Sequence, residues 1–197
     1  DTEEYIDFYG GPNSNSYATL PAAFNDPTNN KFQSANIYDT NIYRTEGLPT
    51  DYGVGTRESN LKSNFDTGVT VEFWLKKEAF NTNDNTEKEV ILDIWNNLTS
   101  SNSDYGRITI ELDGTATNTP FLVTVQSGTS GIFQRRLGTN LQTTSLSTWQ
   151  HYAIKLENTG SNTFQTKLYV TGTLNDTNRY VGSLNELEAK NMKGRIG

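Results

Sequence analysis

Paired carboxylates are the first residues in this chain whose type and spacing could do chemistry. Glu111 and Asp113 are two residues apart in a stretch that alternates like a β-strand, so both side chains would lie on one face. Two such carboxylates can serve as the acid and the nucleophile of glycoside hydrolysis. The other close pair, Glu89 and Asp93, is four residues apart, with Trp95 where another carboxylate could help. We therefore predict no catalytic residues and no enzyme activity.

Nucleophilic and metal chemistry are limited by residue counts. The chain has one histidine, His151, and no cysteine, which excludes thiolate catalysis and histidine-rich metal sites. His151 is the single candidate base for a Ser-His-Asp arrangement, and we interpret it as a packed or hydrogen-bonded residue. Calcium requires carboxylates and loop carbonyls, but no DxDxDG-type run gathers them. The scattered candidates are Asp93, Asp104, Asp113 and Asp176. We assign no metal site and predict no cofactor, with calcium as an open alternative for which no ligand set is defined.

Aromatic side chains beside polar loops indicate a different chemistry, the binding of sugars. Sugar sites combine aromatic faces for stacking with polar groups that hydrogen-bond hydroxyls. The aromatic candidates are Trp74, Trp95, Trp149, Tyr105 and Tyr169. The best local cluster surrounds an Asn/Ser-rich loop, and we predict glycan contacts at Trp95, Asn96, Asn97, Asp104 and Tyr105. The alternative is that all three tryptophans are buried between layers.

These residues have to be positioned by β-strands, because no long stretch has helical periodicity. Residues 68–77 alternate an aliphatic and aromatic set with a set that contains Trp74, and residues 149–157 alternate in the same way. Other strand-like stretches, separated by turn signals, are residues 4–8, 17–21, 89–95, 107–113, 121–125, 132–137, 166–171, 179–184 and 194–197, with a weak helical turn at 185–193. The pattern predicts an all-β, antiparallel sandwich.

The overall composition and net charge exclude some classes of function. The chain has 197 residues and a formal net charge of −7, which opposes nucleic-acid binding because that binding needs Lys and Arg to displace counterions. No apolar run is long enough to span a bilayer, so we expect no membrane insertion. Hydrophobic residues make up only 33% of the chain, yet 11% are aromatic, which indicates a thin aromatic core. The chain begins with Asp1 rather than with Met, so we expect it to be processed or to be a fragment of a longer chain.

Several stretches, in order along the chain, resemble the laminin G-like or concanavalin A-like lectin-glucanase jelly-roll superfamily. GVTVEFWLKK resembles the central strand of that group, STWQHYAIKLE its Trp-x-His-x-Ala strand and GRIG its late Ile-Gly strand. IDFYGGPNSNSYATLP is similar to its first strand pair, EVILDIWNN and YGRITIELDG to the next two strands, and KLYVTGTL to a later strand and turn. The resemblance implies a jelly-roll β-sandwich that forms one laminin G-like domain over residues 1–197.

The chain departs from the pattern of this superfamily in three places. A long irregular insertion at residues 25–64 exceeds what the pattern needs. The closing strand, which should follow GRIG and pair with the N-terminal strand, is missing, so we expect an incomplete C-terminal end and an open sheet edge filled by another chain. The Glu-x-Asp-x-x-Glu motif of β-glucan-cleaving members is absent.

These observations predict a non-enzymatic structural or recognition module of a larger extracellular or virion particle, such as a fibre, decoration or adhesion domain. Its partners would be other protein chains of the assembly, with glycan as a candidate ligand. The alternatives are a free carbohydrate-binding lectin and, as the weakest, a glycoside hydrolase. Trp74 lies opposite the aliphatic set of its strand, and we interpret it as packed under a second layer, the 25–64 insertion.

Overall fold

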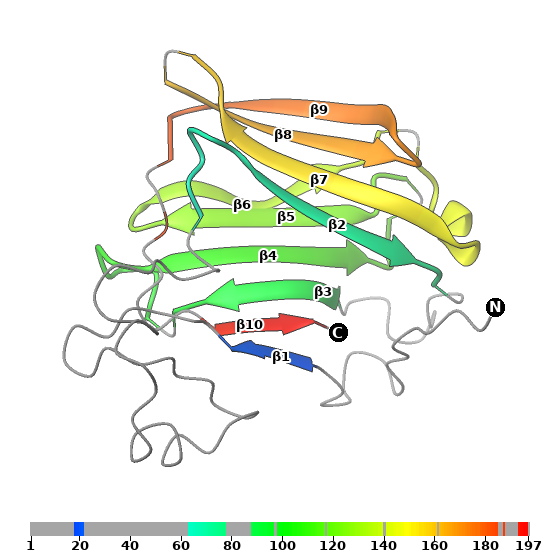
Figure 1. Cartoon of the computed structure of the whole chain (residues 1–197), viewed down its shortest axis with the longest axis horizontal. Helices are drawn as coiled ribbons and strands as arrows, with labels where there is room; N and C mark the ends of the chain where they lie inside the picture. Colours follow the sequence, from blue (N-terminus) through cyan, green and yellow to red (C-terminus); the bar gives the residue numbers. More distant parts are fainter. Residues whose placement is uncertain are drawn as a thin grey trace, which may run out of the picture.

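Two antiparallel β-sheets face each other in the computed structural model (Figure 1). The structure describes residues 18–21, 63–77, 88–96, 98–116, 118–139, 141–160, 162–184, 187 and 193–196. One sheet has six strands in the order β1-β10-β3-β4-β5-β6, and the other has four in the order β2-β7-β8-β9. The predicted all-β sandwich is therefore confirmed, whereas its jelly-roll connectivity stays a prediction.

The strand bounds follow the apolar runs of the sequence. The six-stranded sheet comprises β1 (Ala18–Pro21), β10 (Lys193–Ile196), β3 (Lys88–Trp95), β4 (Gly106–Asp113), β5 (Phe121–Ser127) and β6 (Ser130–Leu137). The four-stranded sheet comprises β2 (Val69–Leu75), β7 (Gln150–Asn158), β8 (Thr163–Val170) and β9 (Thr173–Val181), and the 3-10 helix η3 (Thr143–Ser147) precedes β7. Among the described residues, no helix has the length and apolar character that crossing a membrane requires.

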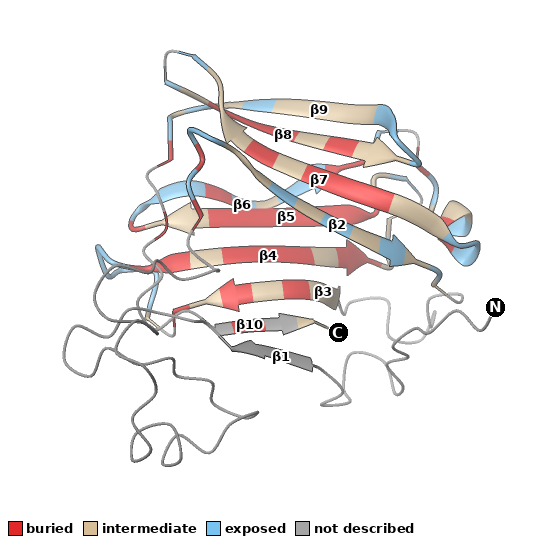
Figure 2. Cartoon of the chain, in the orientation of Figure 1, coloured by how far each residue is buried: buried red, intermediate tan, exposed pale blue. Residues whose placement is uncertain are grey.

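The core lies between the two sheets, and period-2 alternation decides which side chains enter it. On β7, the inward residues Tyr152, Ile154 and Leu156 are fully buried, and the central strands β4 and β5 are largely buried as well (Figure 2). Phe73 on β2 stacks on Tyr152 with ring centroids 5.8 Å apart, and Phe121 on β5 lies 5.3 Å from the same ring. These three rings join the sheets at the centre of the core.

The structure differs from the sequence-based expectation at several strands. The last strand expected at residues 179–184 is instead the end of β9, which begins at Thr173. The stretch GRIG lies in β10, which itself pairs with β1 through Ala18 opposite Ile196, so the N-terminal strand is paired without the closing strand that was expected after GRIG. Residues 4–8, most of the 25–64 insertion and most of 185–193 lie outside the described residues.

Polar contacts link the end of β6, together with the two residues that follow it, to β9. The carboxylate of Asp176 accepts hydrogen bonds from the backbone N–H groups of Gly138 (2.8 Å) and Thr139 (2.9 Å). The amide of Asn178 donates to the carbonyl of Arg136 at 3.1 Å. Partial burial raises the pKa of Asp176, but the hydrogen bonds outweigh it and the net pKa lies below the usual range.

Tyr152 provides a test of the core. Its hydroxyl is buried and has no hydrogen-bond partner among the described residues, so Tyr152→Phe keeps the ring contacts and removes an unsatisfied group. We expect the free energy of unfolding in urea to stay the same or rise by about 1 kcal/mol. Ile154→Ala, on the same strand, should instead lose about 2–5 kcal/mol. A clear loss for Tyr152→Phe would show that the hydroxyl is satisfied.

Asp176 provides a test of the contacts between β6 and β9. Because its pKa is lowered by folding, its contribution is complete above the unfolded pKa of about 3.9 and is lost as the pH falls through the folded pKa. Asp176→Asn should therefore be less stable than the wild type by about 1–3 kcal/mol at pH 7, and the difference should shrink below about pH 4. Asp104→Asn, in an exposed loop, is the control in urea titrations at each pH. An Asp176→Asn deficit that does not change with pH would contradict the assignment.

Candidate functional site

Two exposed tryptophans stand on the outer face of the four-stranded sheet, away from the core. Trp74 on β2 is 65% exposed, and Trp149, which directly precedes β7, is 47% exposed. Trp74 lies opposite His151 in the β2–β7 register, and the two rings are 5.5 Å apart with an interplanar angle of 57°. Trp149 is exposed one residue before the start of β7, two residues before His151. We call Trp74, Trp149 and His151 the aromatic surface.

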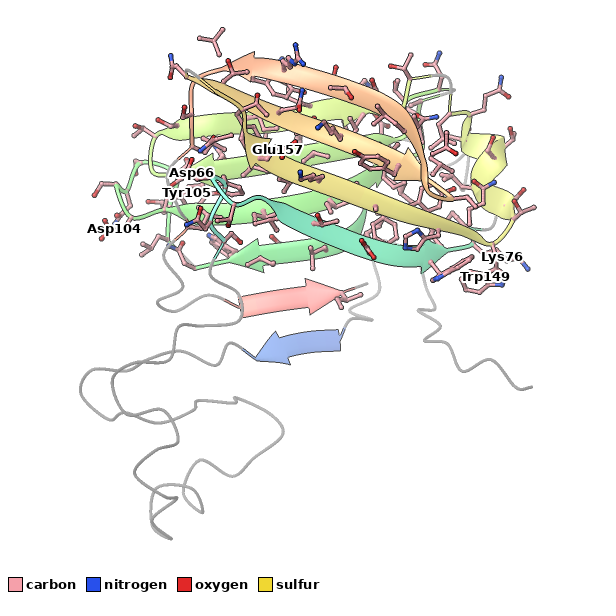
Figure 3. All side chains as sticks on the ribbon, turned by 45° about the horizontal axis from the view of Figure 1, so that its top comes forward. Asp66, Lys76, Asp104, Tyr105, Trp149 and Glu157 are labelled. Atoms are coloured by element: carbon pink, nitrogen blue, oxygen red, sulfur yellow. The ribbon has the colours of Figure 1, made fainter. Side chains whose placement is uncertain are left out.

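Charged groups border the aromatic surface on the same face of β2. Glu72 and Lys76 are both exposed and are each two residues from Trp74. A carboxylate oxygen of Glu72 lies 3.7 Å from Nε2 of His151, which is an ion pair when the imidazole is protonated. Lys76 and Trp149 lie at the same end of the sheet (Figure 3). The surface thus offers ring faces together with hydrogen-bond donors and an acceptor.

Such an arrangement suits a ligand with both apolar faces and hydroxyl groups. Aromatic residues that present an apolar body beside polar groups are typical of recognition surfaces. Folding does not require aromatic residues at these exposed positions, since polar residues there would keep the same strand alternation. The earlier interpretation of Trp74 as packed under a second layer is wrong, because most of its side chain is exposed.

The predicted glycan cluster lies elsewhere, in the connection between β3 and β4. The indole N–H of Trp95 donates to the Leu98 carbonyl at 2.9 Å, and the guanidinium of Arg107 lies 5.4 Å from the Trp95 ring centre. Asn96 is buried and its side-chain amide donates to the backbone carbonyl of Asp104.

The rest of this cluster offers one exposed carboxylate. Tyr105 is only 6% exposed, whereas Asp104 is exposed. Asn97 lies outside the described residues. Asp104 and Tyr105 lie at the opposite end of the molecule from Trp149 (Figure 3). The structure brings the described members of the cluster together through contacts within the loop, and their role as ligand contacts stays a prediction.

Two of the carboxylates considered for calcium or catalysis accept hydrogen bonds from neighbouring side chains. Asp93 accepts two hydrogen bonds from Arg107, at 2.9 and 3.0 Å, and Asp113 accepts from Thr115 and from Arg136. Partial burial raises the pKa of Asp113, but the bonds from Thr115 and Arg136 outweigh it, so its pKa is lowered and the ionised form is favoured. Within the described ranges, no three His, Cys, Asp or Glu side chains form a group that could hold a metal ion.

No family model and no curated protein matches this chain. Among solved structures it is similar to endo-β-1,4-glucuronan lyase from the fungus Trichoderma reesei, with a TM-score of 0.38 and 12% sequence identity, over 66% of this chain and 54% of that chain. The chain therefore spans about half the length of that structure.

The comparison corrects one prediction and leaves another open. The prediction that the chain is not an enzyme is wrong as an exclusion, because the protein with the similar structure is a lyase. The missing hydrolase motif excludes one arrangement of carboxylates and not activity as such. The laminin G-like assignment stays a prediction, since no family model matches.

The exposure of Trp74 leads to a prediction about stability. Trp74→Ala removes a largely exposed ring beside His151, and we expect it to change the free energy of unfolding by about 0.5 kcal/mol or less. The neighbouring Phe73→Ala, which removes a ring stacked on Tyr152, should cost about 3–5 kcal/mol. Both values come from urea denaturation. Equal losses for the two variants would mean that Trp74 is part of the packing.

Proposed function

We propose that this protein binds carbohydrate through the aromatic surface on the outer face of its four-stranded sheet. The observation that carries the proposal is the exposure of Trp74, which lies beside His151, and of Trp149, two residues before His151 in the chain. The two ring faces would stack on the C–H faces of sugar rings, and Glu72 and Lys76 would hydrogen-bond the hydroxyl groups beside them. Trp74 is on β2 and Trp149 directly precedes β7, the strand paired with β2, so the sheet holds their positions before the ligand arrives.

A second candidate is glycan binding at the β3–β4 connection. The Trp95 ring is partly exposed and carries the Arg107 guanidinium over it, and Asp104 is exposed nearby. This candidate is weaker because the indole N–H of Trp95 and the amide of Asn96 are already bonded within the loop. Assembly into an extracellular or virion particle with other protein chains stays a prediction.

Substitution of single aromatic residues tests the proposal. Trp74→Ala and Trp149→Ala should each weaken the binding of oligosaccharides found by a glycan array by roughly tenfold, the loss of about 1.4 kcal/mol of stacking. Phe133→Ala is the matched control, because Phe133 is 62% exposed but lies on β6 of the other sheet. Affinities are measured by isothermal titration calorimetry. Loss of binding in Trp95→Ala, with Trp74→Ala unchanged, would move the site to the β3–β4 connection.

A further inference from the structure

Two lysines lie side by side in the middle of the face that carries the aromatic surface. Lys155 on β7 is directly opposite Lys167 on β8, and one rung of the sheet runs from Thr70 through both lysines to Thr177. Like charges directly opposite each other on neighbouring strands destabilise a sheet. This pair is therefore a local cost to folding that the sheet tolerates.

A single carboxylate lies between the two lysines. Glu157 contacts Lys155 at 2.5 Å through one oxygen and Lys167 at 2.9 Å through the other. Its pKa is lowered by hydrogen bonds from Lys155 and Lys167, so the group keeps two positive charges and one negative. We call Lys155, Lys167 and Glu157 the lysine group, which has a net positive charge.

The whole outer face of this sheet differs in charge from the rest of the chain. Its described charged side chains, apart from His151, are the cations Lys76, Lys155, Lys167 and Arg179 and the carboxylates Glu72 and Glu157, as the strand alternation and register place them. Cations thus outnumber carboxylates on this face, although the chain has a formal net charge of −7. A face on which cations outnumber carboxylates attracts an anionic partner.

The aromatic surface and the lysine group lie along the same strand. Lys155 is four residues after His151, which corresponds to about 13 Å on an extended strand. The rung between them runs from Glu72 through Ala153 and Tyr169 to Leu174. Ala153 is buried and Tyr169 on β8 lies directly beside it, so a ligand lying along β7 would pass beside the Tyr169 ring between the two sites. A separation of this size exceeds one sugar ring and is suited to an oligosaccharide.

We infer that the ligand of this face is an anionic oligosaccharide, which stacks on the aromatic surface and places acidic groups against Lys155 and Lys167. This inference rests on the proposed carbohydrate binding and adds the ligand's charge and its direction along β7. Because both lysines already share Glu157, an acidic group on the sugar would compete with this carboxylate for them. The lysines would therefore select for charge, while the tryptophans hold the sugar backbone.

A set of polymers with one backbone tests the inference. Binding of dextran, carboxymethyl-dextran and dextran sulfate is measured at low and at physiological salt. We expect the charged forms to bind at least about tenfold more tightly than dextran, with the advantage reduced by salt. In the Lys155→Gln/Lys167→Gln variant, this advantage should fall by roughly tenfold. Glu157→Gln should strengthen the binding of the charged forms, because it removes the competing carboxylate.

A matched control separates a defined site from general attraction. Arg135→Gln/Arg136→Gln removes two positive charges from β6 on the other sheet and should leave binding unchanged. Equal losses in this control and in the lysine variant would overturn the inference. Equal binding of dextran and its charged forms would also overturn the inference about charge. If Trp74→Ala then abolished this binding, the proposed carbohydrate binding at the aromatic surface would still stand. Charge-dependent binding that needs the lysines but not Trp74 would refute stacking, and no binding of any polymer would refute both.

Discussion

In the described part of the chain, the four-stranded sheet packs with one face against the six-stranded sheet, and many side chains on its other face are exposed. The position of the candidate site depends on this difference between the two faces. Alternation along β2 and β7 sends Phe73 and Tyr152 into the core and Trp74 and His151 to the outside. A shift of one residue in the register would exchange the two sets. The contacts among Phe73, Tyr152 and Phe121 in the core therefore fix the face on which the aromatic surface is presented.

Much of the fold could be predicted from the sequence, because alternation and turn residues are local signals. The apolar runs at residues 89–95 and 107–113 became β3 and β4 nearly as expected. The pairing of β10 with β1 could not be predicted, since it joins the two ends of the chain. The start of β9 at Thr173 was missed because its residues are polar and half-exposed, without the alternation that marks a strand with one face in the core.

The candidate site was predicted only in part, and the reason is physical. The sequence placed Trp74 and Trp149 on the face away from the aliphatic set, but it could not show whether another layer covers that face. The preference for Trp95, Asn96 and Asp104 followed from their closeness in sequence. In the structure these side chains form hydrogen bonds within the loop, from Trp95 to the Leu98 carbonyl and from Asn96 to the Asp104 carbonyl. Cross-strand neighbours such as Lys155 and Lys167, which are twelve residues apart, carry no sequence signal of their contact.

The three tryptophans of the chain allow the central claim to be measured directly. Each indole N–H gives its own signal in a proton–nitrogen NMR spectrum, and single substitutions assign the three signals. The account predicts that titration with an oligosaccharide ligand shifts the signals of Trp74 and Trp149 together, while that of Trp95, whose N–H is bonded to the Leu98 carbonyl, stays in place. A shift of the Trp95 signal with the other two unchanged would contradict the account.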